Sequence, residues 1–128
     1  MTTLVVVDDE SLVTDFLTFL LEGEGYAVHA AFNGKEALDV VDRVRPALVI
    51  TDLMMPLMSG LALAKALRKQ DGFGQLPIIL CSAAPAPVAE EDAHLFTAIL
   101  QKPYAPSRLV DLVARHTGVP PRDVEDVT

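Results

Sequence analysis

The sequence alternates short aliphatic segments with segments whose apolar residues return every three or four positions. The aliphatic segments are residues 4–7, 27–32, 47–51, 78–82 and 97–100. This spacing indicates strands that are each followed by an amphipathic helix. Strands that alternate with helices are joined by right-handed crossovers and form a parallel sheet covered on both faces. We therefore predict a single α/β domain.

Local signals mark the ends of the predicted helices. The helices run over about residues 11–22, 34–45, 60–70 and 106–117. In the first, Leu12 and Phe16 are among the recurring apolar residues. Asn33 and Glu36 have the spacing of a capping box for the second helix. Between the last two strands, Pro85 and Pro87 delay any helix until about residue 88, so only two short turns are expected there.

The residues of the strands also predict their order. The first, third and fourth are continuous apolar runs, as buried central strands are. The second contains His29, and the fifth begins at Thr97 and is followed by Gln101, as edge strands allow. This favours the flavodoxin-like order 2-1-3-4-5. We predict one doubly wound (βα)5 domain over residues 1–117, with 118–128 a tail or the start of a linker.

Composition excludes several classes of function. The 128 residues, 51% of them hydrophobic, suffice for one core, and the net charge of −8 opposes direct binding to nucleic acid or anionic lipid. Cys81 is the only cysteine, so no intramolecular disulfide forms, and a cytoplasmic location fits best. No apolar run approaches the roughly 20 residues of a membrane span.

Polar residues follow four of the five predicted strands at their carboxyl ends. The first strand is followed by Asp8 and Asp9, the third by Asp52, and the fifth by Lys102, while Ser82 ends the fourth. Carboxyl ends of parallel strands meet at one edge of the sheet, and the switch point of this order lies between the first and third strands. Each residue alone is unremarkable, because an aspartate after a strand is usually a cap. Their convergence predicts a site.

The residues at this edge suit phosphoryl chemistry. Three carboxylates repel one another, and a hard divalent ion such as Mg2+ relieves that repulsion with oxygen ligands. Asp8 and Asp9 are candidates for the metal ligands, Lys102 for the stabilising ammonium and Ser82 for a hydroxyl donor. Asp52 is the candidate nucleophile, which would form an acyl phosphate.

The same residues carry a resemblance to a known family. The chain to about Thr117 resembles the receiver domain of two-component response regulators, which are CheY-like. The resemblance rests on four runs: V-V-V-D-D-E, D-L-M-M-P-L-M-S-G around Asp52, S-A after the fourth strand and K-P-Y after the fifth. The resemblance implies that Asp52 is the phosphoacceptor, that Asp9 ligates Mg2+ directly and Asp8 through water, and that Asp52 and the backbone carbonyl of Met54 complete the ligands.

The resemblance also implies roles for further groups at this edge. Ser82 would donate its hydroxyl to a phosphoryl oxygen, Lys102 would pair with the phosphoryl group, and the amides of Leu53 and Ala83 would face it. The bond between Lys102 and Pro103 would be cis. Such a domain is not an enzyme acting on external substrates, although it supports its own Mg2+-dependent phosphorylation and dephosphorylation.

Partners and rival functions follow from the same comparison. The resemblance implies a sensor histidine kinase or phosphotransfer protein as donor, and a downstream effector or a missing output domain as receiver of the signal; homodimerisation is left open. One rival is a degenerate receiver that binds proteins without phosphorylation. A phosphohydrolase would need a substrate-recognising insertion, and a flavin carrier a glycine-rich loop after the first strand, and the sequence has neither.

Two departures from the family pattern affect the expected readout. Receivers of this family usually have Tyr or Phe three residues before the lysine, where this chain has Ile99. The shortened fourth helix alters the adjacent face. We therefore expect family-like chemistry with a different readout.

Overall fold

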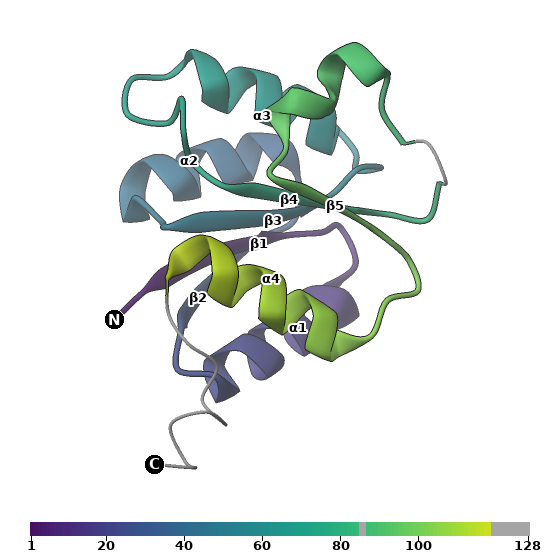
Figure 1. The fold of residues 1–128 in the computed structure, drawn as a ribbon. Helices are drawn as coiled ribbons and strands as arrows, with labels where there is room; N and C mark the ends of the chain where they lie inside the picture. The colour runs from purple at the N-terminus through teal and green to yellow at the C-terminus, as the bar shows by residue number, and fades with distance from the viewer. Residues whose placement is uncertain (85–86, 119–128) are drawn as a thin grey trace.

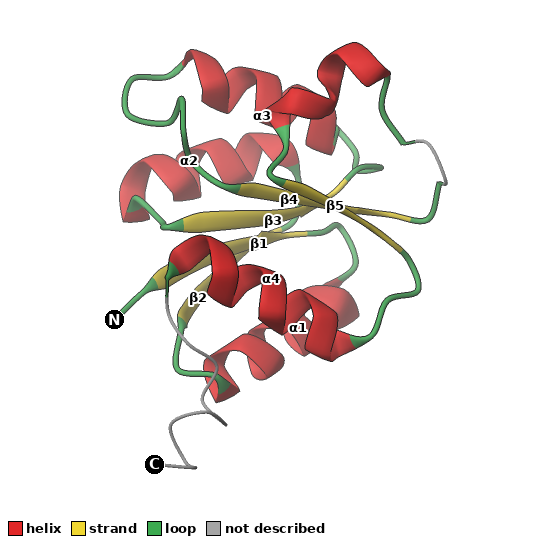
Figure 2. Cartoon of the chain, viewed as in Figure 1, coloured by secondary structure: helices red, strands yellow, loops and turns green. Residues whose placement is uncertain are grey.

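The computed structural model describes residues 1–84 and 87–118, as a parallel sheet between two layers of helices (Figures 1 and 2). The elements are β1 (Thr3–Val7), α1 (Ser11–Gly23), β2 (Ala27–Ala31), α2 (Gly34–Val44), β3 (Leu48–Asp52), α3 (Gly60–Lys69), β4 (Ile78–Ser82), the 3-10 helix η1 (Glu90–Leu95), β5 (Ala98–Gln101) and α4 (Pro106–Thr117). The predicted tail over residues 119–128 lies outside the described residues.

The sheet has the predicted flavodoxin-like order, β2-β1-β3-β4-β5, and all its pairs are parallel. α2, α3 and η1 cover one face, and α1 and α4 cover the other (Figure 1). Successive residues of a strand point to opposite faces, so Val5 and Val7 pack on the first face while Leu4 and Val6 pack on the second. Because both faces of the sheet are covered by helices, the apolar residues of a central strand are buried whichever face they point to, and the central strands are therefore continuous apolar runs in the sequence.

Capping groups fix where the helices begin. The Asn33 side chain accepts a hydrogen bond from the Glu36 N–H at 2.8 Å, as half of the predicted capping box. Ser59 Oγ accepts from the Ala62 N–H at 3.1 Å at the start of α3. Pro106 occupies the first turn of α4, where its missing N–H costs nothing.

The segment between β4 and β5 forms a short 3-10 helix rather than an α-helix. η1 is held against α3 by Arg68, whose guanidinium donates to the carbonyls of Leu95 at 2.7 Å and Phe73 at 2.9 Å. An ion pair of 3.8 Å between Lys65 and Asp92 adds a second link. The segment thus has two turns, as expected, but with the tighter winding that short helices adopt.

The apolar residues of α1 are only partly buried. Leu17 and Leu21 lie in the core, whereas the side chains of Leu12 and Phe16 are exposed. The spacing of three and four did predict the helix, but α1 has more apolar residues than one face can hold. No helix within the described residues combines the length and apolar character that a membrane crossing requires.

Candidate functional site

Strand register places the predicted site residues at nearly the same level of the sheet. Val7 of β1 pairs with Thr51 of β3, so that Asp8 and Asp52 follow on neighbouring strands. Asp52 pairs with Cys81 of β4, and Ser82 pairs with Gln101 of β5. Ser82 therefore extends one residue beyond the level of Asp52, and Lys102 one residue further.

Asp8 is the buried member of the carboxylate group, with only 2% of its surface exposed. Its backbone N–H donates to the Ala31 carbonyl at 3.1 Å, and its Oδ1 accepts from the Glu10 N–H at 2.9 Å. These bonds hold the turn between β1 and α1. The third residue of the D-D-E run thus supports the site through its backbone, a role that the sequence analysis did not identify.

Lys102 lies between two carboxylates. Its Nζ is 3.4 Å from Asp52 Oδ1 and 3.5 Å from Asp8 Oδ2. A backbone hydrogen bond of 2.8 Å from the Lys102 N–H to the Ser82 carbonyl continues the strand pairing to this point. The peptide bond that follows, between Lys102 and Pro103, is cis, as the resemblance implied.

Ser82 ends β4 and is buried, with its hydroxyl oxygen turned into the following turn. Ser82 Oγ accepts a hydrogen bond from the Ala84 N–H at 3.1 Å. The cavity beside it has a volume of about 440 Å3, and its walls are Glu10, Asp52, Leu53, Met54, Ser82, Ala83, Ala84 and Lys102. We call this cavity the crevice. Ser82 and Lys102 therefore both line the space above Asp52.

The loop after Asp52 is shaped by a close backbone approach. Gly60 donates its N–H to the Leu53 carbonyl at 2.9 Å, and a Cβ at Gly60 would collide with the Asp52 carbonyl oxygen. Only glycine allows α3 to begin this close to the acceptor strand. Met54 projects from the same loop with 75% of its surface exposed.

The carboxylates around the crevice outnumber the one ammonium group beside them. Burial raises the pKa of Asp8, and the nearby negative charge of Asp52 raises it further, against the opposing effect of the Glu10 hydrogen bond. Burial alone would lower the pKa of Lys102, but the charges of Asp52 and Asp8 outweigh it and raise that pKa. One ammonium thus faces three carboxylates.

The three carboxylates fit a divalent cation. Asp8, Asp9 and Asp52 each offer an oxygen, and these oxygens lie within 4.8 Å of one another. An all-oxygen donor set with surplus negative charge suits Mg2+, which keeps several waters and binds through one or two carboxylates. The exposed Asp9 and the half-buried Asp52 leave room for such waters.

Topology brings together the residues that the sequence singled out. Asp8, Asp9 and Asp52 form one cluster, Lys102 pairs with two of them, and Ser82 lines the same crevice. The roles assigned to them, and to the Met54 carbonyl, remain predictions.

A comparison with protein families gives one match. The family model described as the response regulator receiver domain matches residues 4–114. The match runs from the second residue of β1 through β5 and into most of α4.

Solved structures give the same answer. The chain is 29% identical to the chemotaxis response regulator CheY4 of Vibrio cholerae, with a TM-score of 0.83, covering 91% of this chain and 98% of that one. It is 31% identical to a putative response regulator of Chloroflexus aurantiacus, with a TM-score of 0.83 and coverage of 91% and 98%. It is also 31% identical to the response regulator TrrA of Thermotoga maritima, solved in complex with Mg2+ and BeF, with a TM-score of 0.83 and coverage of 91% and 99%.

Proposed function

Because the chain belongs to the response regulator receiver domain family, we propose that it accepts a phosphoryl group on Asp52 and signals this state to a partner protein. A receiver is a signalling domain rather than an enzyme that turns over external substrates. The observation that carries the proposal is the position of Lys102 Nζ, 3.4 Å from Asp52 and 3.5 Å from Asp8.

Asp52 is the best acceptor among the three carboxylates. It lines the crevice directly, with 16% of its side chain exposed. Asp8 is buried, and one of its oxygens is held by the Glu10 N–H. Asp9 is exposed and does not line the crevice. A nucleophile needs both access to the donor and a cation beside it, and Asp52 has both.

The surrounding groups support transfer to Asp52. A carboxylate oxygen of Asp52 attacks the phosphorus, the bond from phosphorus to the donor atom breaks, and its electron pair leaves with the donor. Lys102 pairs with the transferred oxygens. Ser82 Oγ already accepts from the Ala84 N–H, which leaves the hydroxyl proton to be donated to a phosphoryl oxygen.

The carboxylate cluster supplies the cation site of the proposal. Mg2+ bound by Asp8, Asp9 and Asp52, with the Met54 carbonyl as a further ligand, would offset the charge of the phosphoryl oxygens. The response regulator TrrA was solved in complex with Mg2+ and BeF, which supports the choice of ion. The chain's own contribution is to hold the three carboxylates within 4.8 Å in the β1-α1 turn and at the end of β3.

Donor and receiver of the signal belong to the same proposal. The donor is the phosphohistidine of a sensor histidine kinase or phosphotransfer protein, and the signal passes to an effector or an attached output domain. The same proposal includes a domain over residues 1–117, with residues 118–128 as a tail or the start of a linker, and a cytoplasmic location. A phosphorylation-independent binding module is disfavoured, because Asp8, Asp52 and Lys102 form an intact group.

Intact-mass spectrometry after incubation with acetyl phosphate and Mg2+ tests the proposal. We expect the wild type to gain one phosphoryl group only when Mg2+ is present. Asp52→Asn should gain none. Asp39→Asn removes an exposed carboxylate on α2, away from the crevice, and should be labelled like the wild type.

Labelling that persists in Asp52→Asn, or that is independent of Mg2+, would contradict the proposal. If the wild type is not labelled, and if its amide NMR spectrum does not change when Mg2+ and beryllium fluoride are added, the phosphorylation-independent binding module is favoured. Beryllium fluoride is a stable mimic of the phosphoryl group, so it distinguishes a protein whose acyl phosphate is too short-lived to detect from one whose crevice binds no phosphoryl group.

A further inference from the structure

The loop between β3 and α3 contains three of the chain's four methionines, and they differ in exposure. Met55 and Met58 are half-buried and pack against the core on the α2 and α3 side of the sheet. Met54 has 75% of its surface exposed, and the fourth methionine, Met1, has 96%. The loop therefore presents one thioether to solvent and holds the other two against the core.

Met54 is also part of the crevice. It is one of the walls, together with Asp52, Ser82 and Lys102. The loop is fixed against β3 because the Gly60 N–H donates to the carbonyl of Leu53, the residue between Asp52 and Met54, at 2.9 Å. A chemical change at Met54 therefore takes place where the acceptor site opens to solvent.

Its exposure makes Met54 a target for oxidation by hydrogen peroxide. The thioether sulfur attacks one peroxide oxygen, and the S–O bond forms as the O–O bond breaks. The hydroxide that leaves takes the proton of the new S–OH group and becomes water, so the sulfur is oxidised and the peroxide is reduced by one electron pair. The product, methionine sulfoxide, is returned to methionine by methionine sulfoxide reductases.

The chain's other sulfur atoms are either screened or far from the crevice. Cys81 is 3% exposed, and burial raises the pKa of its thiol to about 12, which removes the thiolate that oxidants attack. Packing against the core screens Met55 and Met58. Met1 is exposed, but it precedes β1, whereas the crevice lies beyond the other end of that strand. Oxidation should therefore affect the crevice through Met54.

Oxidation changes what Met54 offers to water. The thioether is apolar, whereas the sulfoxide has an oxygen that accepts hydrogen bonds. The water that hydrolyses an acyl phosphate approaches the phosphorus in line, from the side opposite the Asp52 oxygen, and it has to enter through the space that Met54 borders. A sulfoxide oxygen there accepts a hydrogen bond from this water and holds it near the phosphorus.

We propose that Met54 is a reversible oxidation site, and that its sulfoxide shortens the lifetime of the phosphoryl group on Asp52. Peroxide then weakens the signal that a phosphodonor produces, and reduction of the sulfoxide restores it. The second statement rests on the proposed function, whereas the first depends only on the exposure of Met54.

Peptide mapping by mass spectrometry after a short incubation with hydrogen peroxide tests the site. Fragment ions separate Met54 from its neighbour Met55. We expect Met54 to gain one oxygen at a rate within about threefold of Met1, and at least about tenfold faster than Met55 or Met58. In urea all four methionines should react alike. Oxidation of Met55 or Met58 as fast as Met54 in the folded protein would overturn the assignment.

The decay of the phosphorylated protein tests the consequence. Protein is treated with peroxide, then with catalase, phosphorylated with acetyl phosphate and Mg2+, and freed of donor, and phosphoryl loss is followed by intact mass. Each protein is compared with its own unoxidised form. We expect loss from the oxidised wild type to be at least about threefold faster. Met54→Leu, which stays apolar without the sulfur, should show no change on oxidation, and the matched control Met58→Leu should respond like the wild type.

Enzymatic reduction separates the effect of methionine from that of cysteine. The two methionine sulfoxide reductases, one for each epimer of the sulfoxide, should restore the original lifetime when supplied with dithiothreitol. Dithiothreitol alone should not. Recovery with dithiothreitol alone would assign the effect to Cys81 and overturn the proposal.

Two further results would overturn the proposed effect on lifetime. One is an unchanged or longer lifetime in the oxidised wild type, and the other is a response to peroxide that persists in Met54→Leu. If Asp52 takes no label even before oxidation, the proposed function fails and the effect on lifetime fails with it. The peptide mapping still decides, in that case, whether Met54 is the oxidation site.

Discussion

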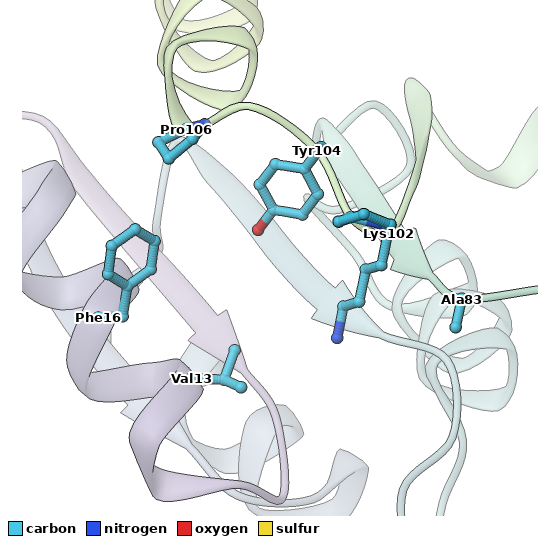
Figure 3. Close-up of a pocket in the computed structure, with 7 residues that line it drawn as sticks. Val13, Phe16, Ala83, Lys102, Tyr104 and Pro106 are labelled. Carbon is cyan, nitrogen blue, oxygen red and sulfur yellow. The ribbon is translucent and has the colours of Figure 1, made fainter.

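Beside the crevice lies an apolar groove, which we call the α1 groove; it is lined by Val13, Phe16, Ala83, Lys102, Pro103, Tyr104 and Pro106 (Figure 3). The two cavities share Ala83 and Lys102 but differ in the kind of residue that builds the rest of their walls. Charged side chains line the crevice from the turn after β1, the end of β3 and the loop after β5. Lys102 pairs with Asp52 inside it and with Asp8 beside it. The groove collects apolar side chains from α1 and the loop before α4, and they face solvent. The crevice thus gathers charge, whereas the groove presents an apolar surface to solvent.

The comparison shows which features a sequence reveals. A charged residue directly after a buried strand stands out, because the apolar run stops there. An exposed leucine on an amphipathic helix looks the same as a buried one. Leu12 and Leu17 are both leucines of α1, yet only the second is in the core.

The largest expected effect separates the two faces of α1. Leu21 is fully buried, so Leu21→Ala should lower the free energy of unfolding by about 3 kcal/mol. Leu12 is 80% exposed, so Leu12→Ala should change this free energy by less than about 0.5 kcal/mol. Urea unfolding of both variants measures this. Equal losses would mean that Leu12 is part of the core and that the outer side of α1 is not exposed.

The second effect concerns the close approach behind the crevice. Gly60→Ala places a Cβ against the Asp52 carbonyl and should cost about 2 kcal/mol or more, because the backbone has to move. At Gly74 a Cβ meets nothing within 4 Å, so Gly74→Ala is the matched control and should be nearly neutral. Thermal unfolding and the acetyl phosphate labelling rate report on both. A stable, normally labelled Gly60→Ala would show that the crevice does not depend on this contact.

The third effect comes from the unbalanced charge. The folded pKa of Asp8 is raised, so without metal the folded state holds this proton more tightly than the unfolded state does. Stability is therefore lost as pH rises from the unfolded pKa through the folded pKa. Asp8→Asn, which mimics the protonated form, should be more stable than the wild type above that window.

Mg2+ should reverse the advantage of Asp8→Asn. The wild type gains stability from binding the ion, and the variant, with one carboxylate fewer, gains less. Urea unfolding from pH 3 to pH 8, with and without Mg2+, gives both comparisons. An advantage that is independent of pH and of Mg2+ would show that Asp8 affects packing rather than the charge of the crevice.

A further expected effect concerns the inertness of Cys81, whose side chain packs in the core on the α1 side of the sheet. Burial raises the pKa of its thiol to about 12, and Tyr104, which lines the groove, is beside it. We expect alkylation by iodoacetamide at pH 8 to be at least about a hundredfold slower in the folded protein than in urea. Fast alkylation of the folded protein would mean that the groove opens down to the sheet.

Much of the fold was predictable for physical reasons. The aliphatic runs, the capping residue Asn33 and the helix-starting Pro106 are local signals, and the structure follows them. The strand order followed from which strands are apolar throughout and which have polar residues. Topology then brought Asp8, Asp52 and Lys102 together, although 50 residues separate the last two.

The rest depended on packing that no local signal carries. The hydrogen bond from Arg68 to the Leu95 carbonyl joins residues that are 27 positions apart, which only the folded structure brings together. The exposure of Phe19 depends on which side of α1 packs against the sheet, because this helix has apolar residues on both sides. Apolar spacing alone does not distinguish those sides, and no local signal in the sequence distinguishes the 3-10 winding of η1 from a short α-helix.

The central claim is that Asp52, among three neighbouring carboxylates, receives the phosphoryl group. Reduction of the acetyl phosphate-treated protein with sodium borohydride, followed by peptide mapping, converts an aspartyl phosphate to homoserine and locates it. The account predicts homoserine at residue 52 alone, formed only when Mg2+ was present. Homoserine at residue 8 or 9, or at position 52 without Mg2+, would contradict it.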